Sequence, residues 1–268
     1  MERPRWAPAD LDLDRPSVAR VYDYYLGGSH NFAVDREFAQ QVLQAMPNVP
    51  QLARENRAFL RRVVRAMSAL GVDQFIDLGS GIPTVGNVHE VAQELDPKAR
   101  VVYVDWDPVA VAHGEAILED NDRTAVIGAD LREPAAIFAD ERVKALIDPS
   151  RPTAILLIAV LHFVPDELKP IELIGQISSL LAPGSHVAIS HASPERQAEQ
   201  IGQAANLYQK TASPVTMRSQ AEIEALFGDL DLLEPGVVQT PLWRPDVPGE
   251  LGPEAYEYPA YAGVGRVR

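Results

Sequence analysis

The stretch QFIDLGSGIPT, residues 74–84, decides how this chain folds. An apolar run ends in Asp77, and Gly79, Gly81 and Pro83 follow it. This order is typical of a buried strand, a tight turn and the start of a helix, because glycine lets the backbone turn without a Cβ in the way. Backbone N–H groups and the positive end of the helix dipole then point at one place, where they can hold a ligand. Taken alone, the stretch serves an ordinary strand–helix turn equally well.

Two further apolar runs are each followed by an acidic residue at the predicted strand end: Asp105 after residues 100–104 and Asp130 after residues 124–128. Predicted strands and helices alternate from here onward, which predicts an α/β fold of the Rossmann-like, doubly wound type, with a mostly parallel sheet and right-handed crossovers. The predicted strands are 74–78, 101–105, 124–128, 153–160 and 185–190, and the predicted helices are 84–95, 108–119, 134–147 and 167–182.

The two ends of the chain differ from this alternating centre. Residues 1–15 are expected to form a loose arm, and the pattern up to residue 70 predicts three helices over 17–26, 35–46 and 52–70. After the last helix, 231–243 and 258–267 have the pattern of two antiparallel strands at one edge. We therefore expect residues 1–70 to form an N-terminal arm and helical lid, and residues 71–268 to form the α/β domain, as one structural unit.

Three helix-start signals support these boundaries. Asp107 before Pro108 is a capping carboxylate followed by proline at the first helical position. Asp166 can cap a helix that begins at Glu167, and Ser219 begins a capping box. In contrast, Asn56 and the arginines at 57, 61, 62 and 65 are expected on solvent-exposed helical faces, although residues 56 and 57 could instead reach a carboxylate.

Composition excludes several kinds of function. The chain has 268 residues, 46% of them hydrophobic, so it can bury a large core. It contains no cysteine, which excludes disulfides, thiolate metal sites and cysteine nucleophiles, and we expect no metal site of another kind. The longest apolar stretch, 154–161, is too short to span a bilayer. A net charge of −14 disfavours nucleic acid as a partner, and a cytoplasmic location fits best.

The acids after the second and third strands suit a nucleoside. Asp105 lies 24 residues beyond Gly81, near the roughly 20 expected for an acid that accepts hydrogen bonds from ribose hydroxyls. Trp106 could stack on a purine or simply pack. Asp130 could accept a hydrogen bond from an exocyclic adenine amine, or it could form a turn before Leu131.

Two histidines and an aromatic segment complete the candidate site. His162, in the loop LHFVPD (161–166) after the fourth strand, is a candidate general base, although such a histidine often only packs or bonds to backbone. His191 follows the fifth strand and has the same two interpretations. Residues 22–32 are rich in tyrosine and contain a Gly–Gly pair, so they either fold over a pocket or pack a helix onto the sheet.

At this point the pattern resembles class I S-adenosylmethionine-dependent methyltransferases. Asp77-x-Gly79-x-Gly81 is similar to their first motif, Asp105 to their ribose-binding acid, and Asp130 with Leu131 to their adenine contact. The chain resembles more specifically a bacterial family described as S-adenosyl methyltransferase, formerly a domain of unknown function. The segments that carry this resemblance are 16–39, 75–118 and 159–166.

The resemblance implies a seven-stranded sheet with an antiparallel last strand and S-adenosylmethionine as cofactor. The methionine end would contact the turn at 79–81 and the N-terminal aromatic segment. Pro83 departs from the class, which often has a third glycine there, so contacts beyond Gly81 are left open. The cofactor-binding residues expected on this basis are Tyr25, Asp77, Gly79, Ser80, Gly81, Asp105, Trp106, Asp130, Leu131 and Ala159.

The leading hypothesis is therefore a methyltransferase that acts on an unidentified small-molecule acceptor, with His162 as base if the acceptor must lose a proton. Transfer from a sulfonium needs mainly positioning, which explains why no nucleophile constellation is evident. A protein that binds S-adenosylmethionine without turnover is an alternative. An NAD-dependent oxidoreductase is disfavoured, because Thr84 stands where its fingerprint needs a third glycine. The sequence does not indicate an oligomeric state.

Overall fold

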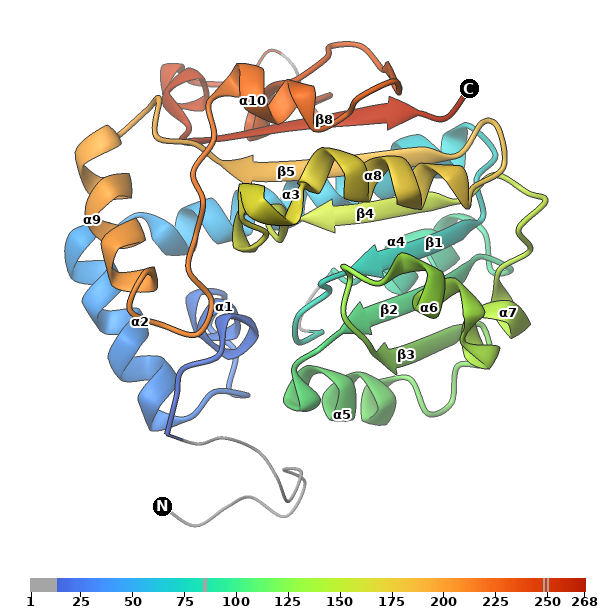
Figure 1. The fold of residues 1–268 in the computed structure, drawn as a ribbon, viewed down its shortest axis with the longest axis horizontal. Helices are drawn as coiled ribbons and strands as arrows, with labels where there is room; N and C mark the ends of the chain where they lie inside the picture. The colour runs from blue at the N-terminus through green and yellow to red at the C-terminus, as the bar shows by residue number, and fades with distance from the viewer. Residues whose placement is uncertain (1–13, 84–85, 248, 250) are drawn as a thin grey trace.

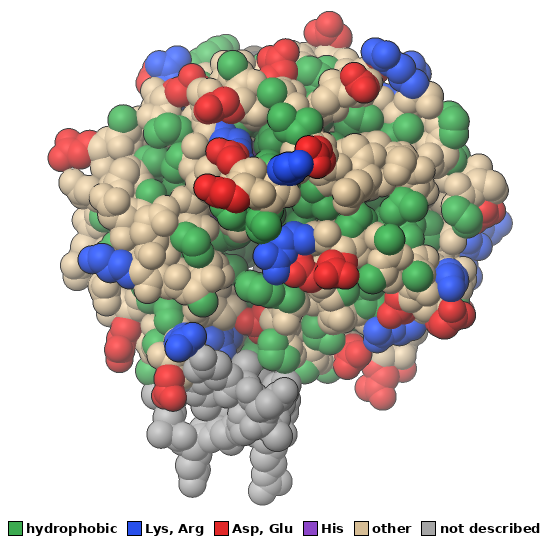
Figure 2. Space-filling model, in the orientation of Figure 1, with side chains coloured by type: hydrophobic (Ala, Val, Ile, Leu, Met, Phe, Trp, Pro, Cys, Tyr) green, Lys and Arg blue, Asp and Glu red, His purple; other side chains and the backbone are tan. Residues whose placement is uncertain are grey.

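The computed structural model describes residues 14–83, 86–247, 249 and 251–268. Most of the expected N-terminal arm and the first two residues of the helix expected over 84–95 lie outside the described residues. Figure 2 shows one face of the molecule, on which acidic and basic side chains are interspersed among apolar ones. The net negative charge is therefore not gathered into one block on this face.

An eight-stranded sheet forms the centre of the molecule (Figure 1). The strands run in the order β3-β2-β1-β4-β5-β8-β6, and β7 also pairs with β8. Strands β1 to β5 are parallel to one another, and β8 is antiparallel to each of its partners, β5 included. The strands are β1 (Gln74–Leu78), β2 (Arg100–Asp105), β3 (Thr124–Gly128), β4 (Ala154–Ile158), β5 (His186–Ala192), β6 (Asp231–Leu232), β7 (Val238–Gln239) and β8 (Ala260–Arg266).

The expected fold class is confirmed, and the strand count differs by one. The resemblance implied seven strands, whereas the segment expected as one strand over 231–243 forms two strands of two residues each. Pro235 and Gly236 interrupt it, since proline has no N–H for the ladder and Gly236 has φ +84°. Both short strands pair with β8, which confirms the antiparallel pairing expected between these two segments.

The described helices match the expected ones closely, with two differences. The single helix expected over 134–147 is divided at Asp140, whose side chain caps the second part. The helix α9 had no counterpart among the expected elements. The helices are α1 (Val18–Tyr25), α2 (Ala33–Ala45), α3 (Val49–Ala69), α4 (Val88–Leu95), α5 (Pro108–Ile117), α6 (Pro134–Ala139), α7 (Glu141–Leu146), α8 (Pro170–Ser179), α9 (Ala198–Tyr208) and α10 (Gln220–Ala225).

Apolar side chains cover both faces of the sheet, as expected for central parallel strands. Alternate residues of β1 divide between the two faces: Ile76 packs with α6, α7, α8 and α10, and Phe75 packs with α3 and α4. A separate apolar cluster joins α1, α2 and α3 to α9 through residues such as Val21, Val42 and Ile201. These helices stand beside the carboxyl ends of the parallel strands in Figure 1. The fold therefore brings an all-helical wall to the strand ends.

Two of the three expected helix caps are confirmed. Asp107 accepts hydrogen bonds from the N–H groups of Val109 and Ala110, and Ser219 forms the capping box of α10. The expected cap at Asp166 is wrong, because α8 begins only at Pro170. Arg218 binds the carboxylate of Asp166 instead.

The expected exposure of the α3 arginines is wrong for Arg62. This side chain is 7% exposed, and its Nε and Nη2 donate to the carbonyl oxygens of Trp243 (2.9 Å) and Thr240 (2.8 Å). Arg65, three residues later, is partly exposed and pairs with exposed Asp246. Arg62 therefore fastens α3 to the segment between β7 and β8.

Replacing Arg62 with methionine should lower the free energy of unfolding by about 2–3 kcal/mol, because two buried carbonyl groups lose their donors. The matched change Arg65→Met removes a partly exposed ion pair and should cost less than about 1 kcal/mol. Urea unfolding followed by circular dichroism measures both values. Equal losses in the two variants would contradict the role given to Arg62.

Candidate functional site

The carboxyl ends of the parallel strands and the N-terminal helices enclose a cavity of about 450 Å³. This volume is ordinary for a site that holds a small molecule. All eleven residues expected at the site line this one cavity: Tyr25, Asp77, Gly79, Ser80, Gly81, Asp105, Trp106, Asp130, Leu131, Ala159 and His162. Residues more than 130 positions apart in the sequence are thus brought together.

The glycine turn after β1 is bound to the end of β2. The N–H groups of Gly79 and Ser80 donate to the carbonyl oxygen of Val104 at 2.8 and 3.1 Å. Gly79 has φ +74°, and a Cβ there would lie 2.4 Å from Cγ2 of Val160, so no other residue fits without displacing this loop. The turn therefore sits directly between the ends of β2 and β4.

Asp105 is buried at the end of β2. Its carboxylate accepts hydrogen bonds from the N–H groups of Gly81 (2.7 Å) and Asp107 (2.8 Å). Burial raises the pKa of Asp105 from 3.8 to about 6, and these hydrogen bonds oppose the rise. An ionised carboxylate has about four acceptor positions, so room remains for hydroxyl donors of a ligand.

Asp77 and Arg57 place opposite charges near each other in the wall of the cavity. Burial raises the pKa of Asp77 to about 7, Arg57 opposes this rise, and Asp105 adds to it. Arg57 is only 7% exposed, so the expectation that it lies in solvent is wrong. Its Nε is buried without a hydrogen-bond partner among the described residues. A ligand that carries both a carboxylate and an ammonium group would complement this pair.

The residues after β2 and β3 form the outer part of the site. Trp106 is 60% exposed and Leu131 is half-buried, and both line the cavity. The carboxylate of Asp130 is bound by Arg132, whose Nε lies 2.8 Å from both oxygens. These hydrogen bonds lower the pKa of Asp130, so it is ionised at neutral pH.

A chain of hydrogen bonds connects the end of β4 to α1. Ala159 has φ +55°, and its N–H donates to Oγ of Ser190 at 2.9 Å. Ser190 donates in turn to Oδ1 of Asn56 (2.6 Å), and the Asn56 amide donates to the hydroxyl of Tyr22 (3.1 Å). The expectation that Asn56 lies in solvent is therefore wrong. These bonds explain how an alanine is held at positive φ, which costs energy for a non-glycine residue.

His162 and His191 lie edge to face, with ring centroids 5.5 Å apart. Nδ1 of His162 is buried and has no hydrogen-bond partner within the described part of the chain. Burial lowers the pKa of His162 well below 6.5, and His191 and Arg218 lower it further. The imidazole is thus neutral at physiological pH, which is the form that can accept a proton.

Arg218 fixes the loop that carries His162, and sequence reasoning missed it. Its guanidinium donates to the carbonyl oxygens of Leu161 and Val164, to Asp166, and to Nε2 of His191 at 2.8 Å. Because arginine has no acceptor, His191 Nε2 is the acceptor and its Nδ1 donates to the backbone. No local pattern around residue 218 indicated this role, because all its partners are far away in the sequence and only folding brings them together.

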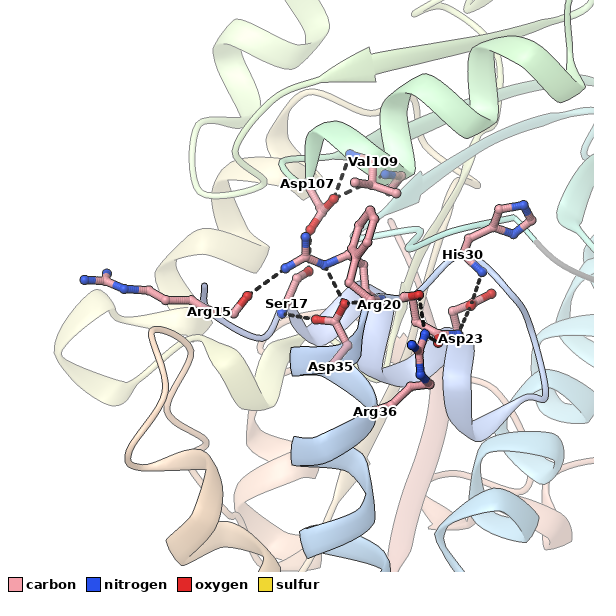
Figure 3. A network of polar contacts seen from close by, with 12 residues as sticks. Arg15, Ser17, Arg20, Asp23, His30, Asp35, Arg36, Asp107 and Val109 are labelled. Carbon is pink, nitrogen blue, oxygen red and sulfur yellow. Dashed lines mark hydrogen bonds and ion pairs between the residues drawn. The ribbon is translucent and has the colours of Figure 1, made fainter. Parts of the chain in front are cut away.

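The N-terminal aromatic segment both lines the cavity and packs, so both interpretations hold. Tyr22 and Tyr25 line the cavity, whereas Phe32 packs in a small apolar cluster with Ile82 and Val109. Figure 3 shows the polar contacts that hold this segment. Ser17 donates to Asp107, and buried Asp35 accepts from the Ser17 N–H (3.0 Å) and pairs with Arg20 (3.2 Å).

Over the described ranges, no group of three potential metal ligands is found, and none of the described helices is both long and apolar enough to cross a membrane.

The strand order and the acids at three neighbouring strand ends define a class I S-adenosylmethionine-dependent methyltransferase fold. A family model described as S-adenosyl methyltransferase matches residues 4–268. The chain belongs to this family, which makes it a methyltransferase with S-adenosylmethionine as methyl donor.

Two solved structures are similar over nearly the full chain. A candidate methyltransferase from Thermobifida fusca YX is 41% identical, with a TM-score of 0.91, over 99% of this chain and 100% of that one. A DUF574 family protein from Streptomyces avermitilis MA-4680 is 34% identical, with a TM-score of 0.91, over 96% and 99%. A curated relative, ribosomal RNA small subunit methyltransferase H of Halorhodospira halophila (strain DSM 244 / SL1), is 33% identical over 63 residues. The match spans 24% of this chain and about a fifth (19%) of that relative's length.

The buried acid at the end of β1 predicts an unusual pH dependence of stability. Because the pKa of Asp77 in the folded chain lies above 3.8, the native state holds more protons than the unfolded state between about pH 4 and 7. The free energy of unfolding without ligand should therefore fall as the pH rises through this window, by at most about 4 kcal/mol from this group. Asp77→Asn should remove its part of the fall.

Urea unfolding at pH 5 and pH 8 measures this difference. Asp130→Asn serves as the control, because Arg132 lowers the pKa of Asp130 and its contribution is lost only below about pH 4. The idea fails if Asp77→Asn and the original protein lose the same stability between the two pH values.

Proposed function

We propose that this chain transfers a methyl group from S-adenosylmethionine to a small-molecule acceptor bound in the cavity beside His162. The observation that carries the proposal is the convergence of Asp77, Asp105 and the turn at 79–81 on one cavity, next to a neutral histidine. The helical wall that borders this cavity beside the strand ends supports a small acceptor.

In this proposal the acids after β2 and β3 bind the nucleoside. Asp105 accepts hydrogen bonds from the ribose hydroxyls with the acceptor positions that its two backbone donors leave free. Trp106 and Leu131 cover the faces of the adenine. Asp130 accepts from the adenine amine, because carboxylate oxygens bound by Arg132 retain lone pairs.

The other end of the donor is an amino acid, and Asp77 and Arg57 suit it. The carboxylate of Asp77 binds the ammonium group, and the guanidinium of Arg57 binds the carboxylate. Ser80 and Tyr25 complete the enclosure at this end, and Ala159 holds the edge of β4 against it. Arg57 extends the set of binding residues beyond those expected from the sequence, and its unpartnered buried Nε supports this role.

The protein contributes mainly position to the reaction. S-adenosylmethionine supplies an electrophilic methyl group on a sulfonium, which an acceptor atom displaces in line. Holding two reactants in such a geometry is worth effective molarities of about 10⁵ M or more. His162 receives the acceptor's proton where one must leave, and Arg218 and His191 position its loop.

The remaining parts of the proposal concern the whole protein. Residues 1–70 act as an arm and helical lid over the α/β domain at 71–268, supported by the contacts of α1 with α5. We place the protein in the bacterial cytoplasm, since both full-length structural relatives come from bacteria and a cysteine-free chain needs no oxidising compartment. The negative charge argues against nucleic acid as the acceptor.

Calorimetry with two ligands tests the assigned contacts. S-adenosylhomocysteine carries the amino-acid end, and 5′-methylthioadenosine lacks it. Arg57→Met should weaken S-adenosylhomocysteine binding at least about tenfold and leave methylthioadenosine binding within about twofold. Asp105→Asn should weaken both ligands at least about tenfold, because both contain the ribose.

Asp122→Asn is the matched control, because its side chain is 91% exposed and is not part of the cavity lining. NAD should give no heat with any variant. If S-adenosylhomocysteine gives no heat with the unmodified, folded protein, the proposed function is wrong. Equal effects of Arg57→Met on the two ligands would reject the amino-acid contact alone.

A further inference from the structure

The cavity extends past the strand ends into a part enclosed by helices, which we call the helical chamber. Its walls come from the end of α2, the start of α3, α9 and the segment that follows α9. They are formed by the apolar side chains of Val42, Met46, Leu52, Ile201, Ala204 and Met217. These residues also belong to, or pack against, one hydrophobic cluster. The chamber therefore presents a hydrocarbon surface to whatever lies beside the methyl donor.

The tyrosine hydroxyls around the helical chamber are already hydrogen-bonded within the protein. Tyr22 donates to the carbonyl oxygen of Ala53 at 3.1 Å, and Tyr258 donates to that of Leu52 at 2.6 Å. The hydroxyls of Tyr25 and Tyr208 pair with each other at 3.3 Å. Of these hydroxyls, only the tyrosine that accepts in the Tyr25–Tyr208 pair keeps an O–H to offer, so a polar or charged group placed here would lose its water and regain few hydrogen bonds.

The charged side chains of the cavity lie elsewhere. Asp77, Asp105, Asp130 and Arg132 lie on or just after the strand ends, and Arg57 lies close enough to Asp77 to affect its pKa. Four of these five have assigned partners in the methyl donor, and Arg132 is paired with Asp130. In the described structure the helical chamber therefore has no charge to offer an ionic acceptor.

His162 lines the cavity, and its Nδ1 is buried without a hydrogen-bond partner among the described residues. The neighbouring ring of Phe163 contacts Tyr208 of α9 at a centroid distance of 6.1 Å, so this loop meets the α9 wall. With its proton on Nε2, the imidazole presents a buried lone pair at Nδ1. A ligand that brings a hydrogen-bond donor to this atom would satisfy it.

We infer, on the basis of the proposed function, that the methyl acceptor is an uncharged, mostly apolar small molecule whose reacting atom is a hydroxyl oxygen. Its apolar body fills the helical chamber, and its hydroxyl donates to His162 Nδ1. During transfer the oxygen–carbon bond forms while the carbon–sulfur bond breaks, and the hydroxyl proton passes to His162. The sulfonium becomes a neutral thioether, the product is a methyl ether, and the imidazolium later releases its proton to solvent.

Three naphthalene probes test this inference by fluorescence titration, with and without S-adenosylhomocysteine. 2-Naphthol is apolar and has the donor, 2-methoxynaphthalene lacks the donor, and 2-naphthol-6-sulfonate carries a charge. 2-Naphthol should bind best, the methoxy compound at least about threefold more weakly, and the sulfonate at least about tenfold more weakly. Incubation with S-adenosylmethionine should convert 2-naphthol into 2-methoxynaphthalene.

Variants connect the binding to the helical chamber. Ala205→Phe fills the space from α9 and should weaken 2-naphthol at least about tenfold, with S-adenosylhomocysteine affinity within about twofold. Asn206→Phe makes the same change on the exposed side of α9 and should alter neither. Ala205→Leu, a smaller change, should give an intermediate loss and replaces the phenylalanine variant if that one does not fold. His162→Leu should abolish the preference for 2-naphthol over its methyl ether.

The inference is overturned if the sulfonate binds as well as 2-naphthol, or if filling the chamber leaves 2-naphthol binding unchanged. Failure of the proposed function looks different, because S-adenosylhomocysteine would then not bind to the unmodified protein. The titrations without S-adenosylhomocysteine still measure how tightly the naphthalene probes bind in the helical chamber, so the two failures are distinguished.

Discussion

Two carboxylates buried side by side at the sheet edge impose the central constraint on this molecule. Asp77 and Asp105 end neighbouring parallel strands, so the strand geometry alone brings them to the same edge. Burial raises the pKa of each, and their mutual repulsion raises that of Asp77 further. The folded chain bears this cost without a ligand. A ligand that brings a positive charge to these carboxylates would offset this cost, so ligand binding would also stabilise the fold.

The N-terminal helices are fastened to the same place. Ser17 donates to Asp107, two residues after Asp105 (Figure 3). The ring centroids of His30 and of His113 on α5 lie 3.8 Å apart. A displacement of α1 would therefore disturb the junction of β2 and α5, which also carries Asp105. The N-terminal helices and the strand ends on either side of the cavity are thus held together. This arrangement favours a site that excludes water while the reactants are bound.

The strand ends could be predicted from the sequence because they rest on local rules. Apolar runs fix the strands, parallel pairing aligns their ends, and glycine at 79 is required by its backbone and by Val160. Arg57 and Arg62 could not be predicted in the same way, since α3 is covered both by the sheet and by the C-terminal segment. The helix α9 was missed because its sequence, AEQIGQAANLY, has few large apolar residues until tertiary packing buries them. The partners of Arg218 exist only after folding.

Arg218 joins loop geometry to the protonation state of the histidines. A guanidinium stays charged in proteins, and here it is buried with two carbonyl oxygens, a carboxylate and His191 as its partners. Burial is the main cause that lowers the pKa of both imidazoles, and the Arg218 charge that holds the loop in place lowers each pKa further, because a second cation nearby would be repelled. An imidazole in this setting accepts a proton only briefly. Such a weak base would suit an acceptor atom that becomes nucleophilic as its proton leaves. Most of the rate acceleration would then come from positioning of the reactants rather than from base strength.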